Sequence, residues 1–136
     1  YVIQPAKSCN DVSMIEIGVF SHEFGHAFGL PDLYDTDGSS QGDGEWALMA
    51  SGSYGGNGAH AEKPTHMNAW SKEFLGWLTP TLVSATTTGI SLPNAAQNAA
   101  AIKVPFGSPT SSAEYFLVEN RQQLGFDQYI RTISFF

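Results

Sequence analysis

The segment from His22 to Asp32 reads His-Glu-Phe-Gly-His-Ala-Phe-Gly-Leu-Pro-Asp and places two histidines four residues apart. On a helix, residues four apart share one face, so His22 and His26 can bind a single metal ion together. Glu23 follows His22 directly and can reach a water on that ion without binding the ion itself. The segment therefore predicts a helix with a metal-binding face, and zinc is the metal that this donor set favours.

The sequence around this segment predicts where the helix begins and ends. Ser13, followed three residues later by Glu16, fits a capping box at the start of the helix. Gly29 can end the helix in a left-handed conformation, and Pro31 prevents its continuation. Apolar side chains occupy most sides of the predicted helix, which we therefore expect to be buried: Met14, Ile15, Ile17, Val19, Phe20, Phe24 and Phe28. Two histidines and a glutamate in a buried helix are costly without polar partners, and a divalent cation satisfies all three.

Composition narrows the classes of function. The chain has 136 residues, 42% of them hydrophobic, and a formal net charge of −7. Nucleic acid is an unfavourable partner for such a chain, because phosphate binding needs a basic surface. No apolar run approaches the ~20 residues that span a bilayer. Cys9 is the only cysteine, which excludes an internal disulfide and a CxxC metal site. The chain starts without Met, and we interpret it as part of a longer protein.

The rest of the chain predicts an α+β domain. A long loop, rich in Gly, Ser and Asp, is expected from Tyr34 to about Gly58. A second helix is predicted from Pro64 or Thr65 to Leu75. Short strands, expected to be antiparallel, follow at residues 81–88, 102–105 and 115–119. We interpret residues 1–136 as a partial catalytic domain. Residues 1–80 hold the helices and the loop, and residues 81–136 form a β-rich segment of this domain or the start of the next.

The long loop carries a second candidate cation site. Its carboxylates lie in an interval without Lys or Arg between Lys7 and Lys63. Alternating carboxylates in a glycine-rich loop suit calcium, although the spacing does not match an EF-hand. A hydrated acidic loop is the alternative. The candidate calcium ligands are Asp35, Asp37, Asp43 and Glu45.

The chemistry of the zinc site follows from its ligands. Zinc held by two histidines and one carboxylate keeps a position for water and lowers the pKa of that water toward ~7. Glu23 then accepts the proton of the attacking water and delivers it to the leaving amine. Asp32 is the favoured third ligand because it comes just after the helix end. Glu73, on the predicted second helix, is the alternative.

The extended motif resembles that of the metzincin peptidases, with Asp32 in the place of the usual third histidine, as in the snapalysin-like enzymes. Further segments resemble secreted bacterial metalloproteases of the immune inhibitor A type. They are Gly29-Leu30-Pro31-Asp32-Leu33-Tyr34-Asp35, Trp46-Ala47-Leu48-Met49-Ala50-Ser51-Gly52, Ala69-Trp70-Ser71-Lys72, Leu75-Gly76-Trp77 and Glu114-Tyr115-Phe116-Leu117-Val118-Glu119-Asn120-Arg121-Gln122.

This resemblance implies a metzincin-like catalytic domain that hydrolyses protein or peptide substrates outside the cell. It makes Met49 the residue of the Met-turn, whose thioether forms an apolar floor under the metal. Tyr54 becomes a candidate for stabilising the transition state, although an ordinary loop tyrosine is the alternative reading. A sheet that binds extended substrate is expected upstream of the active-site helix.

A non-catalytic metal-binding or adhesive module that retains the scaffold is the alternative function. The presence of Glu23 favours the enzyme, because binding zinc does not require a general base.

Overall fold

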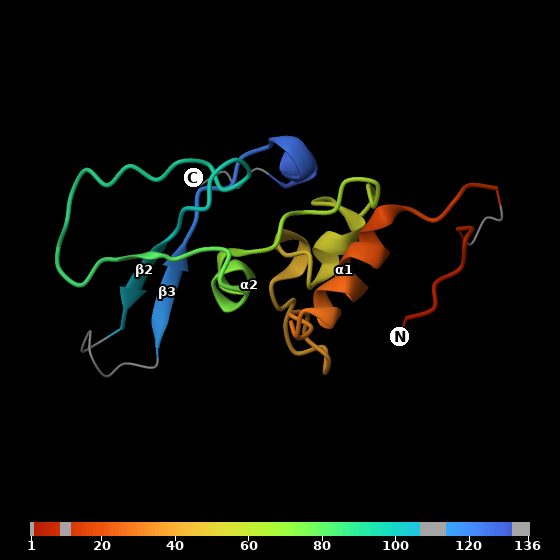
Figure 1. The fold of residues 1–136 in the computed structure, drawn as a ribbon, viewed down its shortest axis with the longest axis horizontal. Helices are drawn as coiled ribbons and strands as arrows, with labels where there is room; N and C mark the ends of the chain where they lie inside the picture. Colours follow the sequence, from red (N-terminus) through yellow and green to blue (C-terminus); the bar gives the residue numbers. More distant parts are fainter. Residues whose placement is uncertain (1, 9–11, 107–113, 132–136) are drawn as a thin grey trace. The chain divides into compact units, whose positions relative to one another are not determined.

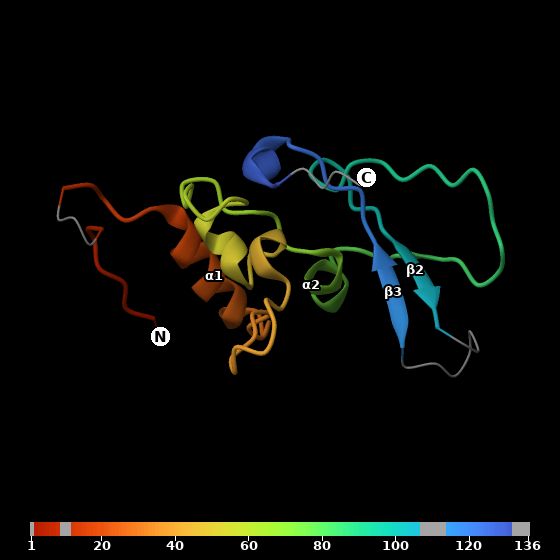
Figure 2. The same cartoon turned by 180° about the vertical axis from the view of Figure 1, so that it is seen from behind.

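The computed structural model describes residues 2–8, 12–106 and 114–131, which form a small α+β structure. It divides into two compact units (Figures 1 and 2). The first unit comprises Tyr1–Met67 and Gln123–Phe136, and the second comprises Asn68–Gln122. Cys9 lies outside the described residues. Within the described residues, no helix is long and apolar enough to cross a membrane.

Helix α1 spans Ile17–Ala27 in the first unit. Its N-cap is Glu16, whose side chain makes no capping hydrogen bond, so the predicted capping box is wrong. Ser13 is instead paired with Ser8, whose backbone N–H donates to the Ser13 carbonyl at 3.0 Å. The two hydroxyls lie 2.8 Å apart. This local pairing holds the chain outside the helix and moves the start of α1 to Ile17.

The C-terminus of α1 is as predicted. Gly29 has a φ of 91°, a left-handed conformation that favours glycine. Its N–H donates to the His26 carbonyl at 2.9 Å, and the Leu30 N–H donates to the Gly25 carbonyl at 3.3 Å. This pair of bonds is a Schellman motif, which satisfies helix carbonyls and turns the chain sharply. Asp32 follows directly after that turn.

The two faces of α1 have different surroundings. Gly18, His22 and Gly25 are buried. A Cβ at Gly18 would overlap the Ser53 carbonyl, so glycine allows close packing against the short 3-10 helix η2, Ser51–Tyr54. The opposite face is exposed, which contradicts the predicted burial on most sides. Its apolar side chains line a shallow groove of about 370 Å³ with Leu48 and Met67: Ile17, Phe20, Phe24 and Phe28.

The predicted long loop contains the core of the first unit. Two short 3-10 helices, η1 (Gly44–Trp46) and η2, flank a buried apolar run, Ala47-Leu48-Met49-Ala50. The fully buried Thr65 hydroxyl lies 2.9 Å from the carbonyl oxygens of Glu45 and Gly52. Farther along the chain, η3 (Gly125–Tyr129) contacts the segment that follows the loop. The Asp127 carboxylate of η3 accepts a hydrogen bond from the His66 N–H at 2.9 Å. The Thr65 contacts therefore hold together the two 3-10 helices on either side of the run that contains Met49.

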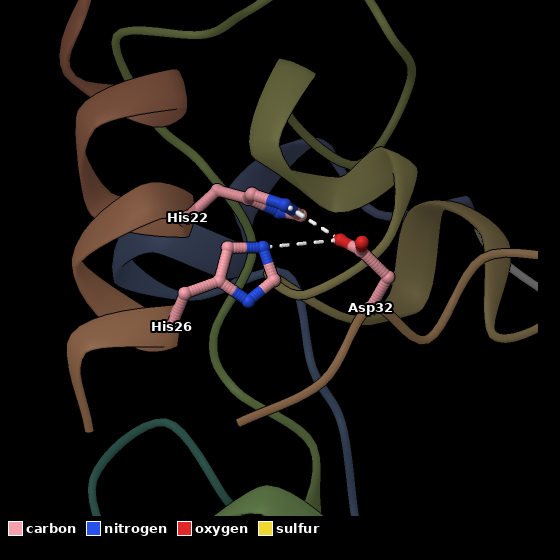
Figure 3. A group of neighbouring side chains, drawn as sticks. All are labelled: His22, His26 and Asp32. Carbon is pink, nitrogen blue, oxygen red and sulfur yellow. Dashed lines mark hydrogen bonds and ion pairs between the residues drawn. The ribbon is translucent and has the colours of Figure 1, made fainter. Parts of the chain in front are cut away.

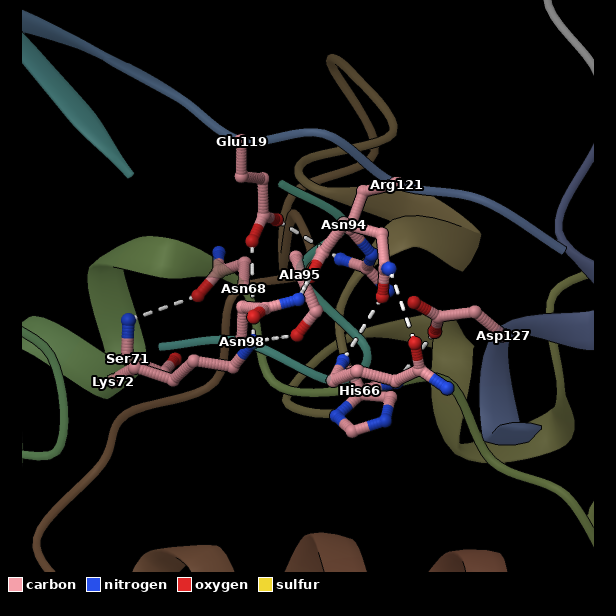
Figure 4. A network of polar contacts seen from close by, with 11 residues as sticks. His66, Asn68, Ser71, Lys72, Asn94, Ala95, Asn98, Glu119, Arg121 and Asp127 are labelled. Atoms are coloured by element: carbon pink, nitrogen blue, oxygen red, sulfur yellow. Dashed lines mark hydrogen bonds and ion pairs between the residues drawn. The ribbon is translucent and has the colours of Figure 1, made fainter. Parts of the chain in front are cut away.

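Helix α2 in the second unit spans Ala69–Phe74, so it begins several residues later than predicted. Asn68 supplies the N-cap, and its side chain accepts from the Ser71 N–H at 2.9 Å (Figure 4). The predicted end is confirmed by Gly76, which has a φ of 71°. Its N–H donates to the Glu73 carbonyl at 3.0 Å. The capping amide, rather than Pro64, therefore determines where α2 begins.

The second unit also contains a three-stranded sheet in the order β1-β2-β3. Its strands are β1 (Thr81–Leu82), β2 (Ile102–Pro105) and β3 (Tyr115–Val118). The antiparallel prediction holds for β2 and β3 but is wrong for β1, which pairs with β2 in parallel. The long connection from β1 to β2 makes this parallel pairing feasible. Strand β1 is also much shorter than the predicted 81–88.

Side chains from α2 and the sheet meet in the second unit. Ala69, Leu78 and Ala101 form its buried apolar cluster, with Leu117 packed against it. Glu119, just after β3, accepts from the Arg121 guanidinium at 3.0 Å and lies 4.0 Å from Lys72 Nζ (Figure 4). Both basic side chains therefore neutralise one largely buried carboxylate.

Candidate metal centre

The structure brings together the three predicted zinc ligands, His22, His26 and Asp32. Figure 3 shows both imidazoles on α1 facing the carboxylate that follows the helix end. Asp32 Oδ1 lies 3.0 Å from His22 Nε2 and 3.2 Å from His26 Nε2. The two rings are nearly perpendicular, with centroids 4.9 Å apart. Their donor atoms and the carboxylate oxygen all lie within 4.8 Å of one another.

Backbone carbonyls determine how both rings are oriented. His22 Nδ1 lies 2.9 Å from the Leu48 carbonyl oxygen, and His26 Nδ1 lies 2.8 Å from that of Leu30. A carbonyl can only accept a hydrogen bond, so each Nδ1 carries the proton. In the neutral imidazole this leaves the lone pair on Nε2, the atom that faces Asp32. Such support by a carbonyl is typical of metal-binding histidines.

The spacing and exposure of this donor set fit zinc. Tetrahedral zinc with bonds of about 2.0–2.1 Å separates neighbouring ligand atoms by roughly 3.3 Å. The observed separations of 3.0 and 3.2 Å are close to that value. The His22 side chain is 11% exposed, whereas those of His26 and Asp32 are 33% and 34% exposed. The centre is therefore anchored in the core on one side and open to solvent on the other.

Glu23 lies beside this centre without joining the group of ligands. Its half-buried side chain lines a cavity of about 280 Å³. His22 contributes to the wall of the same cavity, so the cavity adjoins the metal centre. The remaining lining residues are Val19, Tyr34, Ala50, Ser51, Ser53 and Tyr54. The expected base therefore faces a space large enough for water and part of a substrate.

Tyr34 also lines this cavity, although it was expected only as part of a segment that resembles the family. Its ring is nearly parallel to that of His22, at 23° and 6.3 Å between centroids. The nearby Asp32 carboxylate raises the pKa of the Tyr34 hydroxyl from its usual value, and the charge of Glu23 adds to this effect. The only sequence signal was a tyrosine two residues beyond the expected third ligand.

Met49 lies beneath α1 and is fully buried. A Cβ at Gly25 would overlap the Met49 sulfur, which therefore packs against the helix between the two histidines. The Leu33 N–H donates to the Met49 carbonyl at 2.7 Å, so the same residue also holds the segment that follows Asp32. Tyr54, the tyrosine considered for the transition state, is 53% exposed and lines the cavity from η2.

The candidate calcium ligands do not converge. Among the described residues, His22, His26 and Asp32 are the one group of three or more that could hold a metal. The Asp35 carboxylate accepts hydrogen bonds from Asp37 N–H at 3.1 Å, Ser39 Oγ at 3.1 Å and Ser40 N–H. Glu45 instead pairs with Arg131 at 2.9 Å. The acidic loop thus uses these carboxylates within the protein, which leaves the calcium prediction without support.

The alternative third ligand has a different partner. Glu73 lies on α2 in the second unit, and its carboxylate is 2.7 Å from Lys103 Nζ on β2. The neighbouring residue, Lys72, is largely buried, and its Nζ lies 4.0 Å from the Glu119 carboxylate.

Two histidines and one carboxylate on a helix and the turn that ends it form a candidate metal centre of the kind found in zinc hydrolases. The family described as "Immune inhibitor A peptidase M6, catalytic domain" matches residues 1–78, more than half of the chain. The chain belongs to this family of zinc metalloproteases. The resemblance to the immune inhibitor A type, inferred from the motifs within residues 1–78, is thereby confirmed.

Two curated relatives each match about half of the chain. The chain is 39% identical to the pre-pro-metalloprotease PrtV of Vibrio cholerae serotype O1 over 77 residues, which are 55% of this chain and 8% of that protein. It is 42% identical to immune inhibitor A of Bacillus thuringiensis subsp. alesti over 76 residues, or 54% of this chain and 10% of that protein. The chain thus spans a tenth or less of these relatives. No solved structure matches it.

Proposed function

We propose that this chain supplies the metal centre of a zinc-dependent endopeptidase. The observation that carries the proposal is the convergence of His22 Nε2, His26 Nε2 and Asp32 Oδ1, with both opposite ring nitrogens committed to backbone carbonyls. The cavity next to these atoms contains Glu23. Family membership supports protein or peptide substrates.

His22, His26 and Asp32 would hold the zinc ion, and Met49 would form the apolar floor beneath it. Bound there, zinc supplies a Lewis acid that makes water more acidic and polarises the substrate carbonyl. The Leu48 and Leu30 carbonyls keep both imidazoles in the required tautomer. The sulfur of Met49 packs against Gly25, so this contact also sets the distance between α1 and the residue beneath it.

Glu23 is the general base and then the general acid. Its carboxylate takes a proton as a water oxygen bonds to the peptide carbonyl carbon. The same proton passes to the peptide nitrogen as the carbon–nitrogen bond breaks, so the carboxylate is regenerated. Tyr54 lines the cavity with Glu23 and is a candidate for stabilising the charge on the carbonyl oxygen.

The names of one relative and of the family support a precursor and a site of action outside the cell. One relative is a pre-pro-metalloprotease, and the family takes its name from an immune inhibitor. We therefore propose that the parent protein is secreted and acts on extracellular proteins.

Substituting the base tests the function. Glu23→Gln should bind zinc as wild type does but lower kcat/KM on a casein-type substrate by about 10²–10⁴-fold or more, because proton transfer is lost. Glu16→Gln, at the exposed N-cap of the same helix, is the matched control and should cleave normally. Zinc analysis of each preparation and a chelator control accompany the assay. Near-normal proteolysis by Glu23→Gln would contradict the mechanism, and zinc binding without proteolysis by wild type would favour the non-catalytic module.

A further inference from the structure

The buried run that contains Met49 holds the metal centre through two backbone carbonyls. The Leu48 carbonyl accepts from His22 Nδ1, and the two atoms are 2.9 Å apart. The Met49 carbonyl accepts from the Leu33 N–H at 2.7 Å, and Leu33 directly follows Asp32. The position of this run therefore determines how one histidine is oriented and where the segment with the carboxylate lies.

The Thr65 hydroxyl bridges the residues on either side of this run. Its oxygen lies 2.9 Å from the Glu45 carbonyl oxygen, before the run, and 2.9 Å from the Gly52 carbonyl oxygen, after it. Because the Thr65 N–H already donates to the Gly52 carbonyl at 2.8 Å, the single hydroxyl proton is available to Glu45. A Cβ at Gly52 would overlap the Thr65 hydroxyl, so glycine permits this close approach. Thr65 is only 1% exposed, so bulk water cannot replace these bonds.

The segment that precedes Thr65 also contacts α1. The Gly18 N–H, in the first turn of the helix, donates to the Ala61 carbonyl at 2.9 Å. A Cβ at Gly18 would overlap the Ser53 carbonyl, which lies just after the run. Thr65 therefore connects the run to a segment that is already hydrogen bonded to the helix of the two histidines.

We propose that Thr65 is a positioning residue for the metal centre, because its hydroxyl holds the run that orients His22. The inference rests on the proposed zinc function of the same site. Thr65 acts through the Leu48 carbonyl rather than on the metal. His26 Nδ1 donates instead to the Leu30 carbonyl, which lies in the turn after α1 and outside the run. The two histidines therefore depend on different supports, and Thr65 belongs to that of His22.

The hydroxyl can be tested apart from the shape of the side chain. Thr65→Val keeps the shape and leaves a buried carbonyl without its donor, whereas Thr65→Ser keeps the hydroxyl. Thr87→Val is the matched control, because the Thr87 hydroxyl also lies 2.9 Å from a backbone carbonyl, that of Ala85 in the second unit. If Thr65→Val does not fold, Thr65→Ala compared with Thr65→Ser isolates the same hydroxyl.

Two measurements on the full chain follow the metal centre itself. Zinc dissociation constants come from competition with a chromophoric chelator. NMR of the cobalt-substituted protein resolves the Nδ1 proton of each metal-binding imidazole as a separate shifted signal, and its exchange with water reports how well the carbonyl holds it. Melting temperatures without metal show that each variant folds.

We expect Thr65→Val to weaken zinc binding by about tenfold, the lower end of the range for partners outside the coordination sphere. The Nδ1 proton of His22 should shift and exchange faster in this variant, while that of His26 stays as in wild type. Thr65→Ser and Thr87→Val should bind zinc within about twofold of wild type and keep both signals, since each retains the Thr65 hydroxyl. Changes of equal size at both histidines would indicate a general loss of stability and overturn the positioning role.

The outcomes separate this inference from the proposed function. Equal zinc affinity and equal His22 signals in wild type and Thr65→Val would overturn the positioning role and leave the peptidase standing. A wild type that binds zinc tightly but cleaves no protein would overturn the peptidase, while a selective change at His22 in Thr65→Val would still support the positioning role. A wild type that binds no zinc would overturn both.

Discussion

The turn after α1 and the acidic loop that follows it are adjacent in sequence and differ in what their carboxylates contact. In the turn, Asp32 faces two imidazole nitrogens whose orientation is set by backbone carbonyls. In the loop, Asp35 accepts hydrogen bonds from the loop's own N–H groups and from Ser39. The Asp32 carboxylate faces two nitrogen atoms that could bind the same cation. The Asp35 carboxylate already accepts hydrogen bonds from its own loop.

This difference shows that the partners of a carboxylate, rather than the local density of acidic residues, indicate a cation site. The loop has more carboxylates than the turn, but they do not converge. The turn has one, and the end of the helix places it beside two histidines. The predictions below test whether the two regions differ in function as they do in contacts.

Substituting single carboxylates in the two regions should give the largest difference in zinc affinity. Asp32→Ala should weaken zinc binding by roughly a hundredfold or more, since even supporting partners of metal ligands contribute 10–100-fold. Asp35→Ala and Glu73→Ala should bind zinc within a few-fold of wild type. Zinc competition titrations measure all three. A large loss in Glu73→Ala with normal binding by Asp32→Ala would move the third ligand to α2.

Two glycines with positive φ provide a smaller test. Gly29 (φ 91°) ends α1, and Gly38 (φ 80°) lies in the acidic loop. Alanine at either position should lower the free energy of unfolding by about 1–2 kcal/mol, because it disfavours the left-handed conformation. Only Gly29→Ala should also weaken zinc binding, since the Leu30 carbonyl and Asp32 follow that turn. Chemical denaturation and zinc titration separate the effects, and equal zinc affinities would show that the turn does not position Asp32.

The pH dependence of the loop should give the smallest effect. Hydrogen bonds from Asp37 and Ser40 backbone N–H groups lower the pKa of Asp35 from 3.8 to about 2. Because the pKa is lower in the folded state, Asp35 contributes stability above about pH 4, and that contribution is lost as the pH falls toward 2. Melting curves of wild type and Asp35→Asn between pH 5 and pH 2 should converge, and NMR titration should find the low pKa. A carboxyl that titrates near 3.8 would show that the loop bonds do not form in solution.

Local signals in the sequence predicted part of this structure well. The end of α1 at Gly29, the end of α2 at Gly76 and the bounds of β2 are as predicted, because each depends on a glycine conformation or a short apolar run. The three candidate ligands also follow from local geometry, since helical spacing and the turn after Gly29 suffice to bring them together.

Features that depend on contacts outside a helical or turn pattern could not be predicted. The start of α1 depends on the pairing of Ser8 with Ser13 before the helix, and the parallel pairing of β1 depends on the long connection to β2. The aromatic face of α1 is exposed, although an apolar pattern alone indicates burial. Tyr34 joins the site because Leu33 is hydrogen bonded to the Met49 carbonyl, a contact that no spacing rule encodes.

X-ray absorption spectroscopy of the zinc-loaded chain would test the central claim most directly. The account predicts two imidazole nitrogens at about 2.0–2.1 Å and at least one carboxylate oxygen at about 2.0–2.2 Å. One imidazole contribution should disappear in either His22→Ala or His26→Ala. A zinc shell with fewer than two imidazoles, or one that is unchanged by these substitutions, would contradict the metal centre proposed here.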